Sequence, residues 1–300
     1  MLINKYVHTI VVVALCVYLG ACATVRNGLS LTKNTKQSPI AYLRETNGFW
    51  QIWLTDMTGD KHRQLTFDAM DISRVSWGAG HQHLLANRSD GQLSMINTQT
   101  GGVQLLKLPV KGMLDAQISK DGKWIAFSLI STLKMDTNNL WRIRPDGSGL
   151  QKLTNQGELQ LSPSWSAAGD KVLYTAGTSI ERHEIWMLDV ATGSQQQISQ
   201  GRGFKLDPSI GPAGPIVYSS NVNTTDQFDL WLQDTHNDTP VQLTDTWAVE
   251  SEPAWSPSGQ KLAYVAIDES GNRIWVMDRN GINAHPITPF GATCRGPAWY

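Results

Sequence analysis

The chain has 300 residues, of which 17% are charged, and its formal net charge is −1. This length supports one large domain and excludes a small scaffold held together mainly by disulfides or metals. The near-neutral charge, with no dense cluster of Lys and Arg, provides no electrostatic basis for binding nucleic acid.

Residues 1–21 are predicted to be a bacterial lipoprotein signal peptide. Lys5 supplies the positive charge, and the apolar run Thr9–Leu19 is too short to span a bilayer as a helix. The segment ends in the letters LGAC, which resemble a lipobox, so Cys22 is the predicted lipidation site. The alternative is an ordinary secretory signal that is cleaved near Ala23, with an incidental cysteine.

The residues after the signal are predicted to form a lipidated tether, 22–37, which is polar and lacks periodicity. By resemblance to Gram-negative lipoproteins, a residue other than Asp after the lipidated Cys favours transfer to the outer membrane, and Ala23 meets this condition. Loss of Cys16 with the signal and lipidation of Cys22 leave only Cys294. The mature chain is therefore expected to have no intrachain disulfide.

From residue 38 onward the chain is built on a repeat. An apolar residue followed by Trp recurs five times, and Ser94 takes the Trp position in a sixth copy. Twelve residues later comes an apolar residue followed by Thr or Ser, with Leu106-Lys107 as the weak copy. After twelve more comes a second motif, whose residues are Trp77, Ile118, Trp165, Ile210, Trp255 and Trp299. A repeat of about 40–45 residues made of short strands is typical of a β-propeller blade.

The units follow one another in chain order. The first, 39–67, lacks a leading strand. Complete units follow at 73–111, 114–157, 162–200, 207–245 and 253–288. The last of these predicts four antiparallel strands at 253–256, 261–266, 273–278 and 284–288, joined by Gly-containing turns.

The chain closes with Gly296–Tyr300, which repeats the leading strand that the first unit lacks. We therefore predict an all-β, six-bladed β-propeller over 38–300, with four-stranded blades, closed by the C-terminal strand completing the first blade. The repeated Trp residues are expected to form the core between blades, because a large aromatic at a fixed strand position packs against the neighbouring blade.

In a propeller, the loops between strands two and three and the loops between blades lie on one face. A rigid ring with variable loops and a polar channel mouth is the usual binding surface. The candidate partner-binding residues at the mouth are Arg74, Asp115, Gln160, Lys205, Asp207, Glu250, Glu252 and Arg295. The alternative for any one of them is a solvated loop end. Phe204, Trp247 and Phe290 lie in successive connections between blades, where they either anchor an interface or pack over the blades.

Two stretches carry a resemblance to a known family. PAWSPSGQKLAYVA…RIWVMD…PIT (253–288) and PSWSAAGDKVLYTA…EIWMLD…QIS (163–199) resemble the TolB-type propeller repeat, and the pattern covers about residues 38–300. The resemblance implies a periplasmic propeller that binds the peptidoglycan-associated lipoprotein within the Tol–Pal envelope system. The chain departs from that family in its lipobox and in having a short tether where TolB has an N-terminal α/β domain.

The same repeat occurs in some peptidases and in a pectate-fragment lyase. The chain has no Gly-x-Ser-x-Gly elbow, and only His81 and His83 are closely spaced, at a turn expected on the face opposite the variable loops. We therefore expect a non-enzymatic protein without catalytic residues, metal or cofactor.

The expected function is a monomeric scaffold, lipid-anchored at the periplasmic face of the outer membrane. Its expected partner is an envelope protein, such as the peptidoglycan-associated lipoprotein or other Tol components. A glycan- or peptidoglycan-binding propeller is the alternative, followed by a polysaccharide lyase or hydrolase.

Overall fold

The computed structural model describes residues 38–130, 138–155, 158–179, 182–224, 227–233 and 239–300. The predicted signal peptide, the lipidation site Cys22 and the tether 22–37 lie outside these residues. In the described part of the chain, no helix is long and apolar enough to cross a membrane.

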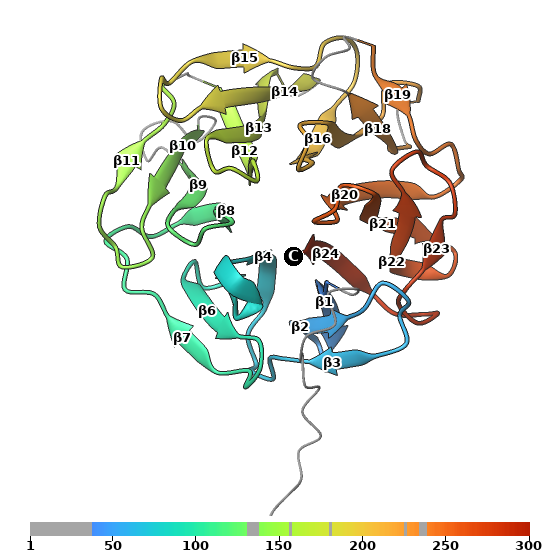
Figure 1. Ribbon diagram of the computed structural model, residues 1–300, viewed down its shortest axis with the longest axis horizontal. Coiled ribbons are helices and arrows are strands. Elements are labelled where there is room, and N and C mark those ends of the chain that lie inside the picture. Colours follow the sequence, from blue (N-terminus) through green and yellow to red (C-terminus); the bar gives the residue numbers. More distant parts are fainter. Residues whose placement is uncertain (1–37, 131–137, 156–157, 180–181, 225–226, 234–238) are drawn as a thin grey trace, which may run out of the picture. The chain divides into compact units, whose positions relative to one another are not determined.

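Six four-stranded antiparallel sheets are arranged around a central axis, as Figure 1 shows. This confirms the predicted six-bladed, all-β propeller. Blade 1 is ordered from the axis outward as β24 (Cys294–Trp299), β1 (Ile40–Thr46), β2 (Phe49–Thr55) and β3 (His62–Gln64). Blade 2 contains β4 (Ile72–Trp77), β5 (His83–Arg88), β6 (Leu93–Asn97) and β7 (Val103–Leu105), with a short 3-10 helix at Ala79–His81.

The remaining four blades follow the same order from inner to outer strand. Blade 3 contains β8 (Met113–Ile118), β9 (Ile125–Ile130), β10 (Asn138–Ile143) and β11 (Gln151–Lys152). Blade 4 contains β12 (Leu159–Trp165), β13 (Lys171–Ser179), β14 (Arg182–Asp189) and β15 (Gln195–Gln197). Blade 5 contains β16 (Lys205–Ile210), β17 (Ile216–Ser220), β18 (Asp229–Gln233) and β19 (Val241–Gln242). Blade 6 contains β20 (Val249–Trp255), β21 (Lys261–Asp268), β22 (Gly271–Asp278) and β23 (His285–Pro286).

The ring closes where the two ends of the propeller meet. β24 pairs antiparallel with β1, with Ile40 opposite Trp299 and Arg44 opposite Cys294. The strand from the end of the chain therefore becomes the innermost strand of the blade that begins it, and it covers the inner edge of β1.

The recurring Thr or Ser of the first motif has a specific hydrogen-bonding role. Its side-chain oxygen accepts the backbone N–H of the residue fourteen positions earlier, on the third strand of the same blade. These bonds measure 2.8–2.9 Å and join Ile52 to Thr66, Leu140 to Thr154, Ile185 to Ser199, Leu230 to Thr244 and Ile274 to Thr288. A buried backbone donor must be satisfied, so the hydroxyl recurs at this position. Blade 2 has Lys107 there.

The second-motif Trp residues link neighbouring blades. The indole Nε1 of Trp165 donates to the backbone oxygen of Gln117 in the preceding blade at 3.0 Å, and that of Trp255 donates to Ser209 at 3.1 Å. Apolar clusters likewise combine two blades, as where Leu230 of blade 5 packs with Tyr264 of blade 6. The core therefore lies between blades, as predicted.

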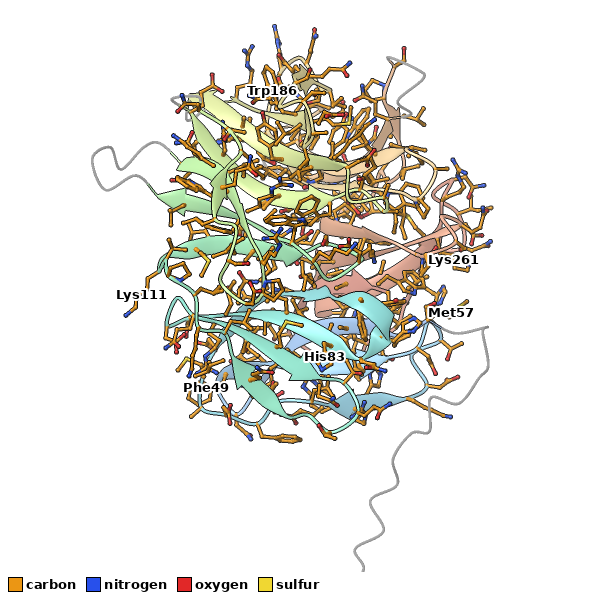
Figure 2. The ribbon with its side chains drawn as sticks, turned by 60° about the vertical axis from the view of Figure 1, so that its left-hand side comes forward. Phe49, Met57, His83, Lys111, Trp186 and Lys261 are labelled. Carbon is orange, nitrogen blue, oxygen red and sulfur yellow. The ribbon has the colours of Figure 1, made fainter. Side chains whose placement is uncertain are left out.

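The propeller has two distinct faces, which Figure 2 shows from the side. We call the face with the connections between blades and between second and third strands the loop face; Lys111 and Phe49 mark it. The opposite turn face, marked by Met57 and Lys261, carries the remaining hairpins. Every inner strand begins at the loop face.

Candidate functional site

Five inner strands are irregular three residues before their second-motif residue, and β4 is irregular one residue earlier, at Ser73. In β16, for example, the pairing skips between Leu206 and Ser209. Four non-glycine residues at this repeat position have φ between 51° and 52°, namely Asp115, Ser162, Asp207 and Glu252. Such left-handed backbone costs an L-residue about 1–2 kcal/mol. Strain that recurs at one repeat position and turns side chains toward one space points to a functional site.

The residues at this repeat position surround the central channel, a cavity of about 260 Å³. We call them the channel ring: Arg74, Asp115, Ser162, Asp207, Glu252 and Gly296. Each lies within the first few residues of its inner strand, so the ring is close to the loop face.

Hydrogen bonds run around the ring from blade to blade. Asp115 forms an ion pair with Arg74 of the preceding blade at 3.7 Å and accepts the backbone N–H of Ser162 in the following blade at 3.2 Å. The Ser162 hydroxyl lies 3.5 Å from Asp207 Oδ1, to which it donates. Glu252 accepts the N–H of Gly296 at 2.5 Å. The carboxylates thus hold the irregular backbone of neighbouring strands in place.

The ring has an excess of negative charge, because three carboxylates face one guanidinium. Burial, together with the nearby charges of Glu252 and Asp115, raises the pKa of Asp207 to about 6, and Arg74 opposes this rise. Repulsion between carboxylates in a confined space is relieved by a cation. The ring is therefore suited to a positively charged group.

Four of the predicted mouth residues, Arg74, Asp115, Asp207 and Glu252, line the channel. Three others, Gln160, Lys205 and Glu250, have a different position from the one expected. They stand five residues before the second motif, and all three side chains are buried between blades. The prediction that these three residues lie at the channel mouth is wrong, because the regular strand backbone before the irregularity directs their side chains into the core between blades.

Lys205 belongs to a buried polar network between blades 4 and 5. Its ammonium lies 3.5 Å from Glu184 Oε1 and donates to the backbone oxygen of Arg202 at 2.6 Å. The second oxygen of Glu184 accepts the Ser199 hydroxyl at 2.6 Å. Burial lowers the pKa of Lys205, and Glu184 counteracts this.

Gln160 and Glu250 repeat this arrangement in other blades. The Oε1 of Gln160 accepts the hydroxyl of Thr154 in a short hydrogen bond. Glu250 accepts the hydroxyl of Thr244 at 3.4 Å and that of Thr246 in a short bond. Burial raises the pKa of Glu250 to about 7. These side chains connect the first motif to the inner strand and have no route to a partner without opening the blades.

Arg295, the remaining predicted mouth residue, lies one position before the channel ring. Its guanidinium stacks 4.1 Å above the Trp50 ring and donates to the backbone oxygen of Ile72 at 3.4 Å. It therefore joins blade 1 to blade 2 on the loop face.

The closely spaced histidines and the buried cysteine do not form a catalytic cluster with the channel ring. His81 and His83 flank the turn between β4 and β5 on the turn face, where the His81 ring packs against Tyr300. No group of three or more His, Cys, Asp or Glu among the described residues could hold a metal ion. Cys294 is buried, and burial raises the pKa of its thiol to about 11, so it is not a nucleophile at neutral pH.

The loop-face aromatics divide into two kinds. Phe204 stacks on His183 with ring centroids 5.1 Å apart, so it packs over its blade. Trp247 is 100% exposed and Phe290 is 80% exposed. Phe67, 75% exposed, completes this set; it directly follows the motif Leu65-Thr66 and was not predicted from the sequence.

Six four-stranded blades around a polar channel define a six-bladed β-propeller with a candidate site in its centre. The chain belongs to the TolB β-propeller domain family, whose model matches residues 125–300. A search of curated proteins found no significant match to this chain.

Solved structures share the fold. TolB from Acinetobacter baumannii matches with a TM-score of 0.75 and 17% identity over 87% of this chain, which spans 66% of that protein, just under two thirds of its length. A putative TolB from Agrobacterium tumefaciens matches at 0.69 and 18% identity, covering 88% of this chain and 99% of the other. An oligogalacturonate lyase in complex with manganese matches at 0.61 and 12% identity, covering 84% and 74%.

Proposed function

We propose that this propeller binds a protein partner in the bacterial cell envelope through its loop face and channel ring. The observation that supports this most is the ring itself. Four blades accept a strained left-handed residue at one repeat position, and the side chains line a shared channel. Such a rigid, polar, concave surface suits recognition of a side chain or a short segment from another protein.

The finer proposal concerns location. The lipobox at Cys22 supports a lipid anchor, and the residue after it supports the periplasmic face of the outer membrane. Membership in the TolB propeller family supports a role related to the Tol–Pal system, with the peptidoglycan-associated lipoprotein as the first candidate partner.

Glycan binding is the second candidate, and the chemistry of the ring favours it less. Sugar sites combine carboxylates with exposed aromatic faces. The six ring residues include no aromatic side chain, and the Trp residues that line the channel use Nε1 to bond other blades, as Trp165 and Trp255 do. Within the ring itself, mixed charges without an aromatic side chain suit a peptide better.

Site-specific crosslinking in intact cells tests the proposal. A photo-crosslinking residue is placed in the full-length protein at Ser73, exposed beside the ring, or at Ser258, exposed in the turn between β20 and β21 on the turn face, as the matched control. We expect one envelope protein to be captured from Ser73 and lost with Glu252→Lys. Equal capture from both faces, or retained muropeptides with no captured protein, would contradict protein binding at this face.

The anchor is tested separately with Cys22→Ser in the same cells. We expect the variant to leave the membrane fraction. Retention there would argue against lipidation without affecting the binding proposal.

A further inference from the structure

Three large aromatic side chains stand exposed in three consecutive connections between blades. Trp247 lies between blades 5 and 6, Phe290 between blades 6 and 1, and Phe67 between blades 1 and 2. Exposing a large aromatic side chain to water is less favourable than exposing a polar one, and soluble monomers expose few such groups together. Each connection continues directly into an inner strand that carries a ring residue.

Two of these connections are acidic, and the connection with Phe290 carries no charged residue. Residues 65–71, 243–248 and 287–293 contain Asp68, Asp71 and Asp245 and no Lys or Arg. Asp68 and Asp245 are exposed, whereas Asp71 accepts the backbone N–H of Trp50 at 2.8 Å. We call these three connections the aromatic half of the loop face.

Two of the other connections have the opposite character. Residues 106–112 carry Lys107 and Lys111 with no acid, and both side chains are exposed. The connection that follows blade 4 carries the exposed Arg202. The connections between blades therefore differ in charge around the ring, and among the described residues the exposed aromatics stand only on the side that contains Asp68 and Asp245.

We propose that the aromatic half docks a basic segment of a partner protein, with apolar side chains on Trp247, Phe290 and Phe67 and a Lys or Arg side chain entering the channel ring. This inference rests on the proposed function and specifies the partner's chemistry. Trp and other aromatics are the residues that most often dominate binding energy. The exposed Asp68 and Asp245 and the ring carboxylates complement a positively charged segment.

Charge argues for a protein segment over a lipid surface. Peripheral proteins that insert aromatics into anionic membranes place Lys and Arg around them. Here the three connections themselves contain no Lys or Arg, and the exposed Lys107, Lys111 and Arg202 lie in other connections. The Arg273 guanidinium, which lies 6.0 Å from the centroid of the Phe290 ring, is paired with Asp268 at 3.7 Å. An anionic membrane would repel the aromatic half, whereas a basic peptide would be attracted to it.

Fluorescence anisotropy with three labelled twelve-residue peptides tests the proposal on the purified mature chain. The first alternates Leu and Lys among Gly and Ser, the second replaces each Lys by Glu, and the third replaces each Leu by Ser. We expect the first peptide to bind about tenfold or more tightly than the other two, because it alone satisfies both the aromatic and the acidic parts. Equal affinity of the Lys and Glu peptides would overturn the proposal, as would tighter binding to anionic phospholipid vesicles than to the first peptide.

Substitutions locate the binding. Trp247→Ala is expected to weaken the first peptide about tenfold or more, and Asp245→Asn several-fold with a smaller dependence on salt. The matched controls are Val241→Ala and Val103→Ala, exposed apolar residues on outer strands. Equal loss in the controls and in Trp247→Ala would overturn the proposal.

A triple variant, Phe67→Ala, Trp247→Ala and Phe290→Ala, separates this inference from the proposed function. If crosslinking from Ser73 captures its partner unchanged in the triple variant, the loop face binds a protein but the aromatic half does not, and only the inference fails. Loss of capture with an unchanged thermal melt supports the inference.

Discussion

In the inner strands of blades 5 and 6, two positions that lie two residues apart both carry charged side chains, yet they have different roles. The position five residues before the second motif holds Lys205 and Glu250, which are buried between blades. The position three residues before it holds Asp207 and Glu252, which line the channel. The comparison shows that in this repeat the backbone conformation decides the role of a charged residue. It directs the side chain either into the core between blades or into the channel, where a partner can reach it.

The physical cause is the irregularity between the two positions. Regular strand geometry points the earlier side chain toward the preceding blade, where a carboxylate or a motif hydroxyl bonds it, as Glu184 does for Lys205 and Thr154 does for Gln160. The left-handed residue then redirects the chain, so the later side chain faces the channel. Substitutions at the earlier position should therefore act on stability, and those at the later position on binding.

The largest effect is expected when the buried pair is broken. Glu184→Ala leaves the Lys205 ammonium without its carboxylate and removes the acceptor of the Ser199 hydroxyl, so the free energy of unfolding should fall by about 3–5 kcal/mol. Urea unfolding at pH 7 measures it. Asp115→Asn in the channel ring is the control, with a loss below about 1 kcal/mol. Similar losses for both variants would remove the distinction between the two positions.

A smaller loss of stability is expected when the first-motif hydroxyl of one blade is removed. Thr288→Val keeps the shape of the side chain but leaves the Ile274 N–H without its acceptor, which should lower the free energy of unfolding by about 1–3 kcal/mol. Lys107→Val at the equivalent position of blade 2 is the matched control and should change it by less than about 0.5 kcal/mol. The role assigned to the hydroxyl would be wrong if the two variants melted alike.

The pH dependence of stability should distinguish Glu250 from an ordinary surface carboxyl. Burial raises its pKa from 4.5 to about 7, so the fold favours the protonated form, and the associated stability is complete below pH 4.5 and lost as the pH rises through 7. Glu250→Gln resembles the protonated form and should be about 1–2 kcal/mol more stable than wild type at pH 8. Melts from pH 5 to pH 8 measure this difference, and a difference independent of pH would contradict it.

The smallest effect is expected in the channel ring. The pKa of Asp207 is raised to about 6 by burial and by Glu252, so the fold favours its protonated form, and that stability is lost as the pH rises through 6. Asp207→Asn should therefore raise the free energy of unfolding by about 0.5–1 kcal/mol at pH 8 and leave it unchanged at pH 4. Thermal melts at the two pH values test this, and destabilisation at pH 8 would show that the ring carboxylate supports the fold.

Much of the fold could be predicted from the sequence, because the repeat exposes it. The two twelve-residue intervals placed the first-motif hydroxyls and the second-motif Trp residues, and Gly296–Tyr300 revealed the closing strand of blade 1. The division of the candidate site was not predicted. The type of a polar residue near the start of an inner strand does not reveal whether its backbone is regular or left-handed. The sequence therefore predicts the channel mouth for both Lys205 and Asp207.

Pairing of β1 with β24 also determines when blade 1 can be completed during synthesis. During synthesis β1 emerges first, and its inner edge stays unpaired until the strand 294–299 emerges some 250 residues later. Such distant pairing slows folding and prolongs the interval in which an open strand edge is available to other chains. The inner edge of β1 therefore remains open to pairing with other chains until strand 294–299 has been synthesised.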